Sequence, residues 1–164
     1  MKPKQLKFIA TALTLTLALG SACLHAQTVE VHNAWVRSTV PGQKGTGAFM
    51  SLTAQESTRL VGIDSPVAGV AEVHEMKMEG DVMKMRALPG LDLPAGKRVE
   101  FKPGSYHVML MDLKQPLPKD TSVPLVLRFK NAKGVQSQLD LSVPVRTVAP
   151  DAGKAHPHGA HSHD

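Results

Sequence analysis

Two short segments that alternate strictly on either side of a Gly-Asp pair constrain the fold of this chain most. Residues 74–78 (HEMKM) and 83–87 (MKMRA) each switch between a soft or apolar side chain and a charged one at every position. This two-residue period is that of a β-strand. Gly80 and Asp81 stand midway between the segments, where a type II′ turn needs a positive φ at its first central residue. The sequence therefore predicts a two-residue β-hairpin.

The register of this hairpin gathers sulfur and imidazole on one face. It pairs Met78 with Met83, Met76 with Met85, and His74 with Ala87. His74 and Met85 become diagonal neighbours about 7–8 Å apart at the backbone, a gap that long side chains can close on a shared ion. Segment 106–111 (YHVMLM) alternates in the same way and places His107, Met109 and Met111 on one face.

Such a set of side chains favours the binding of a soft metal ion. A thioether is a neutral, polarisable donor that selects Cu(I) over hard ions, and imidazole suits several metals. The alternative is that the methionines fill the core, as most methionines on strands do. The histidines on the same face argue against that alternative, because imidazole is costly to bury without a partner.

The spacing of the four donors resembles the signature of the periplasmic copper chaperones called PCuAC. In that family a His, ten residues, a Met, twenty-one residues and His-x-Met follow one another, and here they fall on His74, Met85, His107 and Met109. Further similar segments are 33–37 (NAWVR), 41–42 (PG), 47–50 (GAFM), 85–86 (MR), 93–96 (LPAG) and 104–107 (GSYH), so that the resemblance spans about residues 28 to 147.

This resemblance implies a cupredoxin-like Greek-key fold and a Cu(I) site made by those four residues. It leaves open whether Met76, on the same strand face as His74, joins them. It further implies delivery of copper towards the copper-bearing subunit of a cytochrome oxidase, with a thioredoxin-like copper-assembly protein as a second partner. We expect a monomer or a weak dimer linked by metal.

The remaining strand signals predict an all-β domain over residues 27–147, built as an antiparallel sandwich or barrel. They fall at 29–37, 47–53, 58–63, 99–101, 123–129 and 138–145. Pro124 and Pro144 predict that the last two strands reach a sheet edge. Alternation along the first strand places Trp35 on the opposite face from His32 and predicts a core or ledge residue there, whereas we expect His32 to be structural or at the surface.

Residues 1–26 have the form of a secretory signal peptide, with three lysines, an apolar run of about a dozen residues and small residues before Ala26. That run is too short to span a bilayer. Gly20 replaces the leucine expected three residues before a lipidated cysteine, so we expect no anchor at Cys23. The predicted location is the periplasm.

Cleavage after Ala26 lowers the formal net charge from +5 to +2, with 16 basic residues against 14 acidic ones. Such a balance gives no basis for binding nucleic acid. Cleavage also removes the single cysteine, and the lack of a thiolate ligand disfavours a blue-copper electron carrier. No nucleophile with a partner base is present, so we predict no enzymatic activity.

Residues 148–164 lack large apolar side chains and are predicted to be a disordered tail. It carries four histidines, at His156, His158, His161 and His163. Short His-rich tracts bind metals, and Cu(II) heads the affinity order for nitrogen ligands. The alternatives are an affinity tag or a solvated tail. For the whole chain, the second function to weigh against a copper chaperone is a copper-sequestering resistance protein, and the third is a copper enzyme or a metal-free structural domain.

Overall fold

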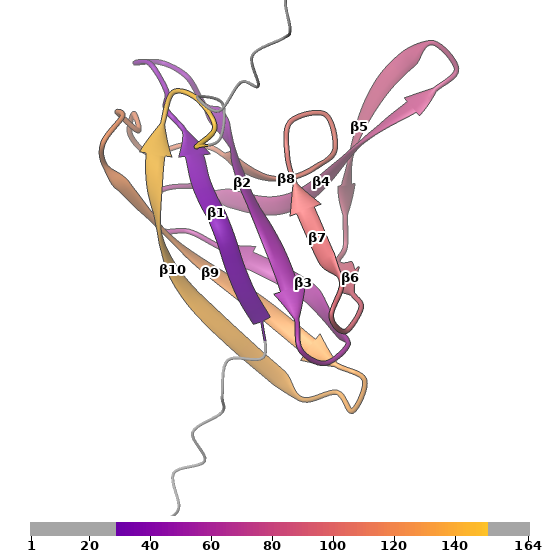
Figure 1. Cartoon of the computed structure of the whole chain (residues 1–164). Helices are drawn as coiled ribbons and strands as arrows, with labels where there is room; N and C mark the ends of the chain where they lie inside the picture. The colour runs from indigo at the N-terminus through magenta and orange to yellow at the C-terminus, as the bar shows by residue number, and fades with distance from the viewer. Residues whose placement is uncertain (1–28, 151–164) are drawn as a thin grey trace, which may run out of the picture.

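The computed structural model describes residues 29–150, and in this part of the chain all regular structure is β (Figure 1). Ten strands form one sheet, in the order β5-β4-β8-β7-β2-β1-β10-β9-β3-β6. Their bounds are β1 (Val29–Arg37), β2 (Gly45–Ala54), β3 (Thr58–Asp64), β4 (Val70–Glu79), β5 (Val82–Leu88), β6 (Leu91–Leu93), β7 (Arg98–Phe101), β8 (Tyr106–Met111), β9 (Ser122–Asn131) and β10 (Gln136–Arg146). The all-β prediction is confirmed.

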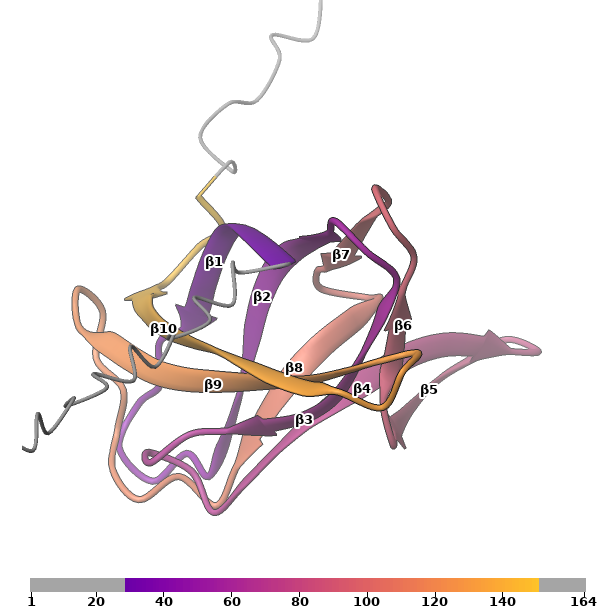
Figure 2. The same ribbon diagram turned by 90° about the horizontal axis from the view of Figure 1, so that it is seen from below.

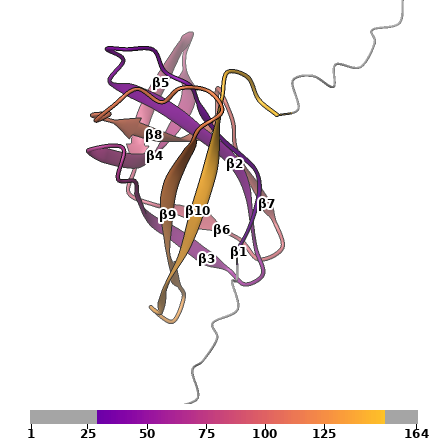
Figure 3. The same ribbon diagram turned by 90° about the vertical axis from the view of Figure 1, so that its left-hand side faces the viewer.

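The sheet curls on itself into a barrel that is nearly closed (Figure 2). The strand β3, near one end of the order, comes beside β4, near the other. Most pairings are antiparallel, as expected, and two are parallel, β1 with β10 and β7 with β8. Figure 3 shows β9 and β10 running side by side, and their ladder pairs nine residues on each strand.

The core lies inside this barrel because each strand turns its alternate apolar residues inward. Leu52 on β2, Val108 and Leu110 on β8, and Leu125 and Leu127 on β9 are all completely buried. Burial of a side chain of this size stabilises the fold by about 1.5–3 kcal/mol. Since Val108 and Leu110 point inward, the residues between and beside them on β8 face outward, and these include His107 and Met109.

The hairpin of β4 and β5 has the predicted register, with Met78 opposite Met83, Met76 opposite Met85 and His74 opposite Ala87. Gly80 has a φ of 63°. Asp81 is absent from the residues of positive φ in the described chain, as a type II′ turn requires. The local prediction is confirmed.

Trp35 is buried, as predicted for a core or ledge residue, but the face predicted for it is wrong, because the first strand contains a β-bulge. The pairing of β1 with β2 shifts between His32 and Trp35, and Asn33 there has a φ of 52°. The extra residue turns Trp35 to the outer side of the sheet, the side of His32, where it lies opposite Phe49. His32 is half exposed, as predicted, 3.5 Å from Glu30.

The two prolines do not mark sheet edges either, since β9 lies between β10 and β3, and β10 lies between β1 and β9. Pro124 is tolerated because the ladder between β3 and β9 stops at Val126. Pro144 directly precedes Val145, where the short parallel pairing with β1 begins. Each proline therefore lies at a position where its strand is paired on one side only, although the strand has a neighbour on each side in the sheet.

None of residues 29–150 forms a helix of the length and apolarity needed to cross a membrane. The predicted signal peptide at 1–26, Cys23 and the four tail histidines lie outside the described residues.

Candidate metal centre

The two histidines of the predicted site lie directly opposite each other on adjacent strands. β4 and β8 pair antiparallel, and His74 faces His107 in their ladder. The ring centroids are 5.8 Å apart and the ring planes are tilted by 56°. Each residue is only 8% exposed, although both lie on the outer face of the sheet.

Each ring has a hydrogen-bond acceptor at one nitrogen, and this fixes which nitrogen carries the proton. His74 Nε2 lies 3.2 Å from a carboxylate oxygen of Glu72, and His107 Nδ1 lies 3.2 Å from the backbone carbonyl of Ser105. Because carboxylate and carbonyl oxygens only accept, each of these nitrogens donates when the ring is neutral. The lone pair is then on His74 Nδ1 and on His107 Nε2.

His74 Nδ1 is buried and has no hydrogen-bond partner, the one side-chain nitrogen or oxygen among residues 29–150 in that condition. Leaving a buried acceptor unpaired costs about 1–3 kcal/mol. Histidines that bind metals commonly donate their second nitrogen to a carboxylate or a backbone carbonyl. The rings of His74 and His107 both have this arrangement, and it fits a metal ion.

The pKa of His107 is lowered from its ordinary value, mainly because burial disfavours the charged imidazolium. The hydrogen bond to the Ser105 carbonyl opposes this shift, and the nearby His74 adds to it. The ring is therefore neutral at pH 7, which is the form that binds metal.

Thioethers complete the donor set around a surface hollow of about 330 Å³ next to His107. Met109 and Met76 line this hollow together with His107. Two glycines of β2 make room for it. A Cβ at Gly45 would lie 3.3 Å from the methyl of Met109, and one at Gly47 would lie 2.8 Å from the Phe49 ring.

The structure places the fourth predicted donor, Met85, on β5 directly across from Met76. Met85 is 51% exposed and does not line the hollow. Thus His74 and His107 face each other on β4 and β8, Met109 and Met76 line the hollow with His107, and Met85 lies at the solvent side. The assignment of the four ligands, and of Met76 as an auxiliary one, stays a prediction.

The rings of Phe49 and Trp35 form an aromatic wall beside His107, which was not predicted from the sequence. The Phe49 ring lies 6.4 Å from the His107 ring and 4.7 Å from the ring of Trp35, measured between centroids. The Arg37 guanidinium lies over the Phe49 ring, 5.5 Å from its centroid. The wall restricts the position of His107 and keeps water from one side of it. Glu72 was also missed, although its place two residues before His74, on the same strand face, was a usable signal.

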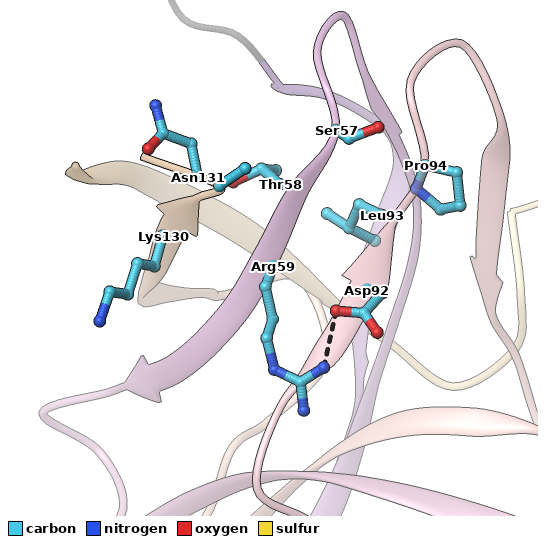
Figure 4. Close-up of a pocket in the computed structure, with 9 residues that line it drawn as sticks. Ser57, Thr58, Arg59, Asp92, Leu93, Pro94, Lys130 and Asn131 are labelled. Atoms are coloured by element: carbon cyan, nitrogen blue, oxygen red, sulfur yellow. Dashed lines mark hydrogen bonds and ion pairs between the residues drawn. The ribbon is translucent and has the colours of Figure 1, made fainter. Parts of the chain in front are cut away.

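A second hollow, of about 420 Å³, lies between β3, β6 and β9 (Figure 4). The Arg59 guanidinium there is 2.6 Å from the Asp92 carboxylate, and Lys130 projects beside them. It lacks histidine and methionine. Within residues 29–150 no three side chains among His, Cys, Asp and Glu form a metal-binding group. The hollow next to His107, in contrast, offers the thioethers of Met76 and Met109, which favours a soft ion.

Comparisons with known proteins agree with this fold. The model of the LpqE-like family ("Putative lipoprotein LpqE-like") matches residues 29–145. A "Putative lipoprotein Lxx21020" of Leifsonia xyli subsp. xyli (strain CTCB07) is 29% identical over 157 residues, which cover 88% of this chain and 92% of that protein.

Among solved structures, Cu(I)-bound DR1885 from Deinococcus radiodurans is 26% identical, with a TM-score of 0.56 over 79% of this chain and 83% of that one. The apo form of DR1885 is 28% identical, with a TM-score of 0.54 over 89% of this chain and 97% of that one. The copper-bound PCuAC domain of PmoF2, at 21% identity, a TM-score of 0.55 and coverage of 73% and 94%, shows the same fold. The expected resemblance and its cupredoxin-like fold are confirmed, and the chain belongs to the LpqE-like family, with the fold of the PCuAC domains.

Proposed function

We propose that this protein is a copper carrier that binds one Cu(I) with His74, His107, Met109 and Met85, and passes the ion to a partner protein. The observation that supports it most is the orphaned Nδ1 of His74, buried beside His107, whose side chain lines the hollow together with two thioethers. The match to the Cu(I)-bound form of DR1885 supports the same ion.

In this proposal some residues hold the ion and another allows its release. Glu72 and the Ser105 carbonyl hold the two imidazoles in the tautomers that leave a lone pair for the metal. Met109 supplies sulfur from the hollow, where Gly45 leaves room for its methyl group. Met85 is half exposed, so a partner's ligand can replace it without opening the core.

A Cu(I) titration against a chelator of known affinity tests this site, with Met109→Leu as the variant. Leu keeps the approximate volume of Met without the sulfur, so its packing cost is typically under about 1.5 kcal/mol. Met50→Leu is the matched control, because Met50 is a core methionine that is 3% exposed. The proposal requires that only Met109→Leu weakens Cu(I) binding, and equal affinities in the two variants would refute it.

The proposed recipient is the copper-bearing subunit of a cytochrome oxidase, with a thioredoxin-like copper-assembly protein as a further partner, and the proposed place is the periplasm. A second candidate function is copper sequestration for resistance, favoured by the four histidines at 156, 158, 161 and 163. Oxidase activity in scarce copper and growth in excess copper, measured in a strain without the protein, separate the two. Loss of oxidase activity alone supports delivery, and copper sensitivity alone supports sequestration.

The mature N-terminus decides how the protein is retained in the envelope. We propose cleavage after Ala26 and no lipid anchor, while the word lipoprotein in the names of the family and the relative favours Cys23 as the alternative. The intact mass of the exported protein distinguishes an unmodified Gln27 terminus from a lipidated Cys23.

A further inference from the structure

Beyond the hollow, the hairpin of β4 and β5 extends away from the barrel (Figure 1) and carries methionines that the proposed Cu(I) site does not use. Met78 is 55% exposed and Met83 is 47% exposed, and the two lie directly opposite each other. Met50, in contrast, is 3% exposed in the core. Filling of the core therefore does not account for Met78 and Met83.

The other face of the same hairpin is charged and paired. Glu79 contacts both Lys84, at 2.7 Å, and Arg86. These neighbours lower the pKa of the Glu79 carboxyl, chiefly through the hydrogen bond from Lys84. The hairpin thus has one face that interacts with water through ion pairs and one face of thioethers. Four methionines make up the second face, in the pairs Met78 with Met83 and Met76 with Met85.

From this arrangement we propose that Met78 and Met83 bind a second Cu(I) in a thioether-only site at the outer end of the hairpin. The inference rests on the proposed function, because the ion it would take is the ion that the histidine site carries. Directly opposite residues in an antiparallel pair have Cβ atoms about 4.5–5.5 Å apart. Two methionine side chains, each with three rotatable bonds, can bring both sulfurs to one ion from that separation.

The place of this site suggests its use. The next pair along the hairpin, Met76 and Met85, lies two residues away, or about 7 Å at the rise of a strand. Met76 already lines the hollow with His107 and Met109. Soft donors therefore continue from the exposed tip to the histidines, so that Cu(I) can enter or leave stepwise. With two neutral donors and no imidazole, the outer site binds more weakly than the inner one and fills second.

Anaerobic titration of the mature full-length protein with Cu(I) tests this, followed by NMR of the methionine methyl groups labelled with carbon-13. The first equivalent is expected to shift the Met109 resonance. The second is expected to shift those of Met78 and Met83, and Met50 serves as the internal reference that stays fixed. A Met78→Leu/Met83→Leu double variant should lose the second step only. Val82→Leu is the matched control, because Val82 is an exposed residue of the same hairpin that pairs with Glu79 and carries no sulfur.

Resonances of Met78 and Met83 that stay fixed through two equivalents, while that of Met109 moves, would overturn the outer site and leave the proposed function standing. Movement of Met78, Met83 and Met109 together in the first equivalent would also overturn it, because that result means one shared site. A Met109 resonance that never moves would instead refute the proposed function itself.

Discussion

A methyl group added at Gly47 tests how tightly the Phe49 ring is held in the aromatic wall beside His107. Gly47 lies on β2 opposite Met109, and a Cβ there would come 2.8 Å from Cζ of Phe49. This is about 0.6 Å short of 3.4 Å, the near limit of ordinary van der Waals contact. The ring cannot move freely, because Trp35 stacks on it at 4.7 Å and Arg37 lies over it. Overpacking of this kind costs about 1–3 kcal/mol.

Alanine also lowers the conformational entropy of the unfolded chain, which stabilises the folded protein by about 0.4–1 kcal/mol. We therefore expect Gly47→Ala to lower the free energy of unfolding by about 1–2 kcal/mol. Gly62→Ala is the matched control. The nearest atoms to a Cβ at Gly62, in the Arg128 side chain, are 3.9 Å away. That variant should be as stable as the original protein or more stable by up to about 1 kcal/mol.

Urea unfolding at equilibrium measures both changes, and the fluorescence of the single tryptophan, Trp35, reports it because that side chain is 4% exposed when folded. Displacement of the Phe49 ring should also shift the ring resonances of His107, whose centroid is 6.4 Å away. A Gly47→Ala protein as stable as the Gly62→Ala protein, with unchanged His107 resonances, would refute the role given to the wall.

Three further predictions concern the histidines. Glu72→Ala removes the acceptor of His74 Nε2 and should weaken Cu(I) binding about tenfold in a chelator competition, the lower end of such effects because Glu72 is partly exposed. Because the folded-state pKa of His107 is lowered, the apo protein should lose stability as the pH falls from 7 through the ordinary value of about 6.5 and below, and His107→Gln should remove that part of the dependence in urea unfolding. Truncation after Thr147 should reduce the Cu(II) stoichiometry by one ion at neutral pH, and an unchanged stoichiometry would mean that the tail does not bind the ion.

The hairpin and the outward face of β8 could be predicted because their signals are local. A two-residue period and a Gly-Asp turn determine the register of β4 and β5 without reference to the rest of the chain. The strand β6, at Leu91–Leu93, is too short to show a period and was missed. The bulge at Asn33 was missed because one residue in the left-handed region reverses every later side chain of the strand. Asparagine is enriched in that region, but this tendency alone does not locate a bulge.

The sequence was enough to predict which residues belong to the candidate site, but it could not predict how they are arranged in space. The spacing pointed to His74 and His107. Their cross-strand pairing, however, requires β4 and β8 to be neighbours in the sheet, and 26 residues separate these two strands along the chain. Which methionine lies next to His107 depends on the packing of β2 against β8. Sequence spacing therefore could not show that Met76 lines the hollow while Met85 is exposed to solvent.

X-ray absorption at the copper edge of the mature protein, loaded anaerobically with one equivalent of Cu(I), tests the central claim most directly. The ion should have both sulfur and imidazole nitrogen in its first shell, and the sulfur contribution should fall in Met109→Leu but not in the Met50→Leu control. A first shell of nitrogen and oxygen alone, unchanged by Met109→Leu, would contradict a carrier built on thioethers and two histidines.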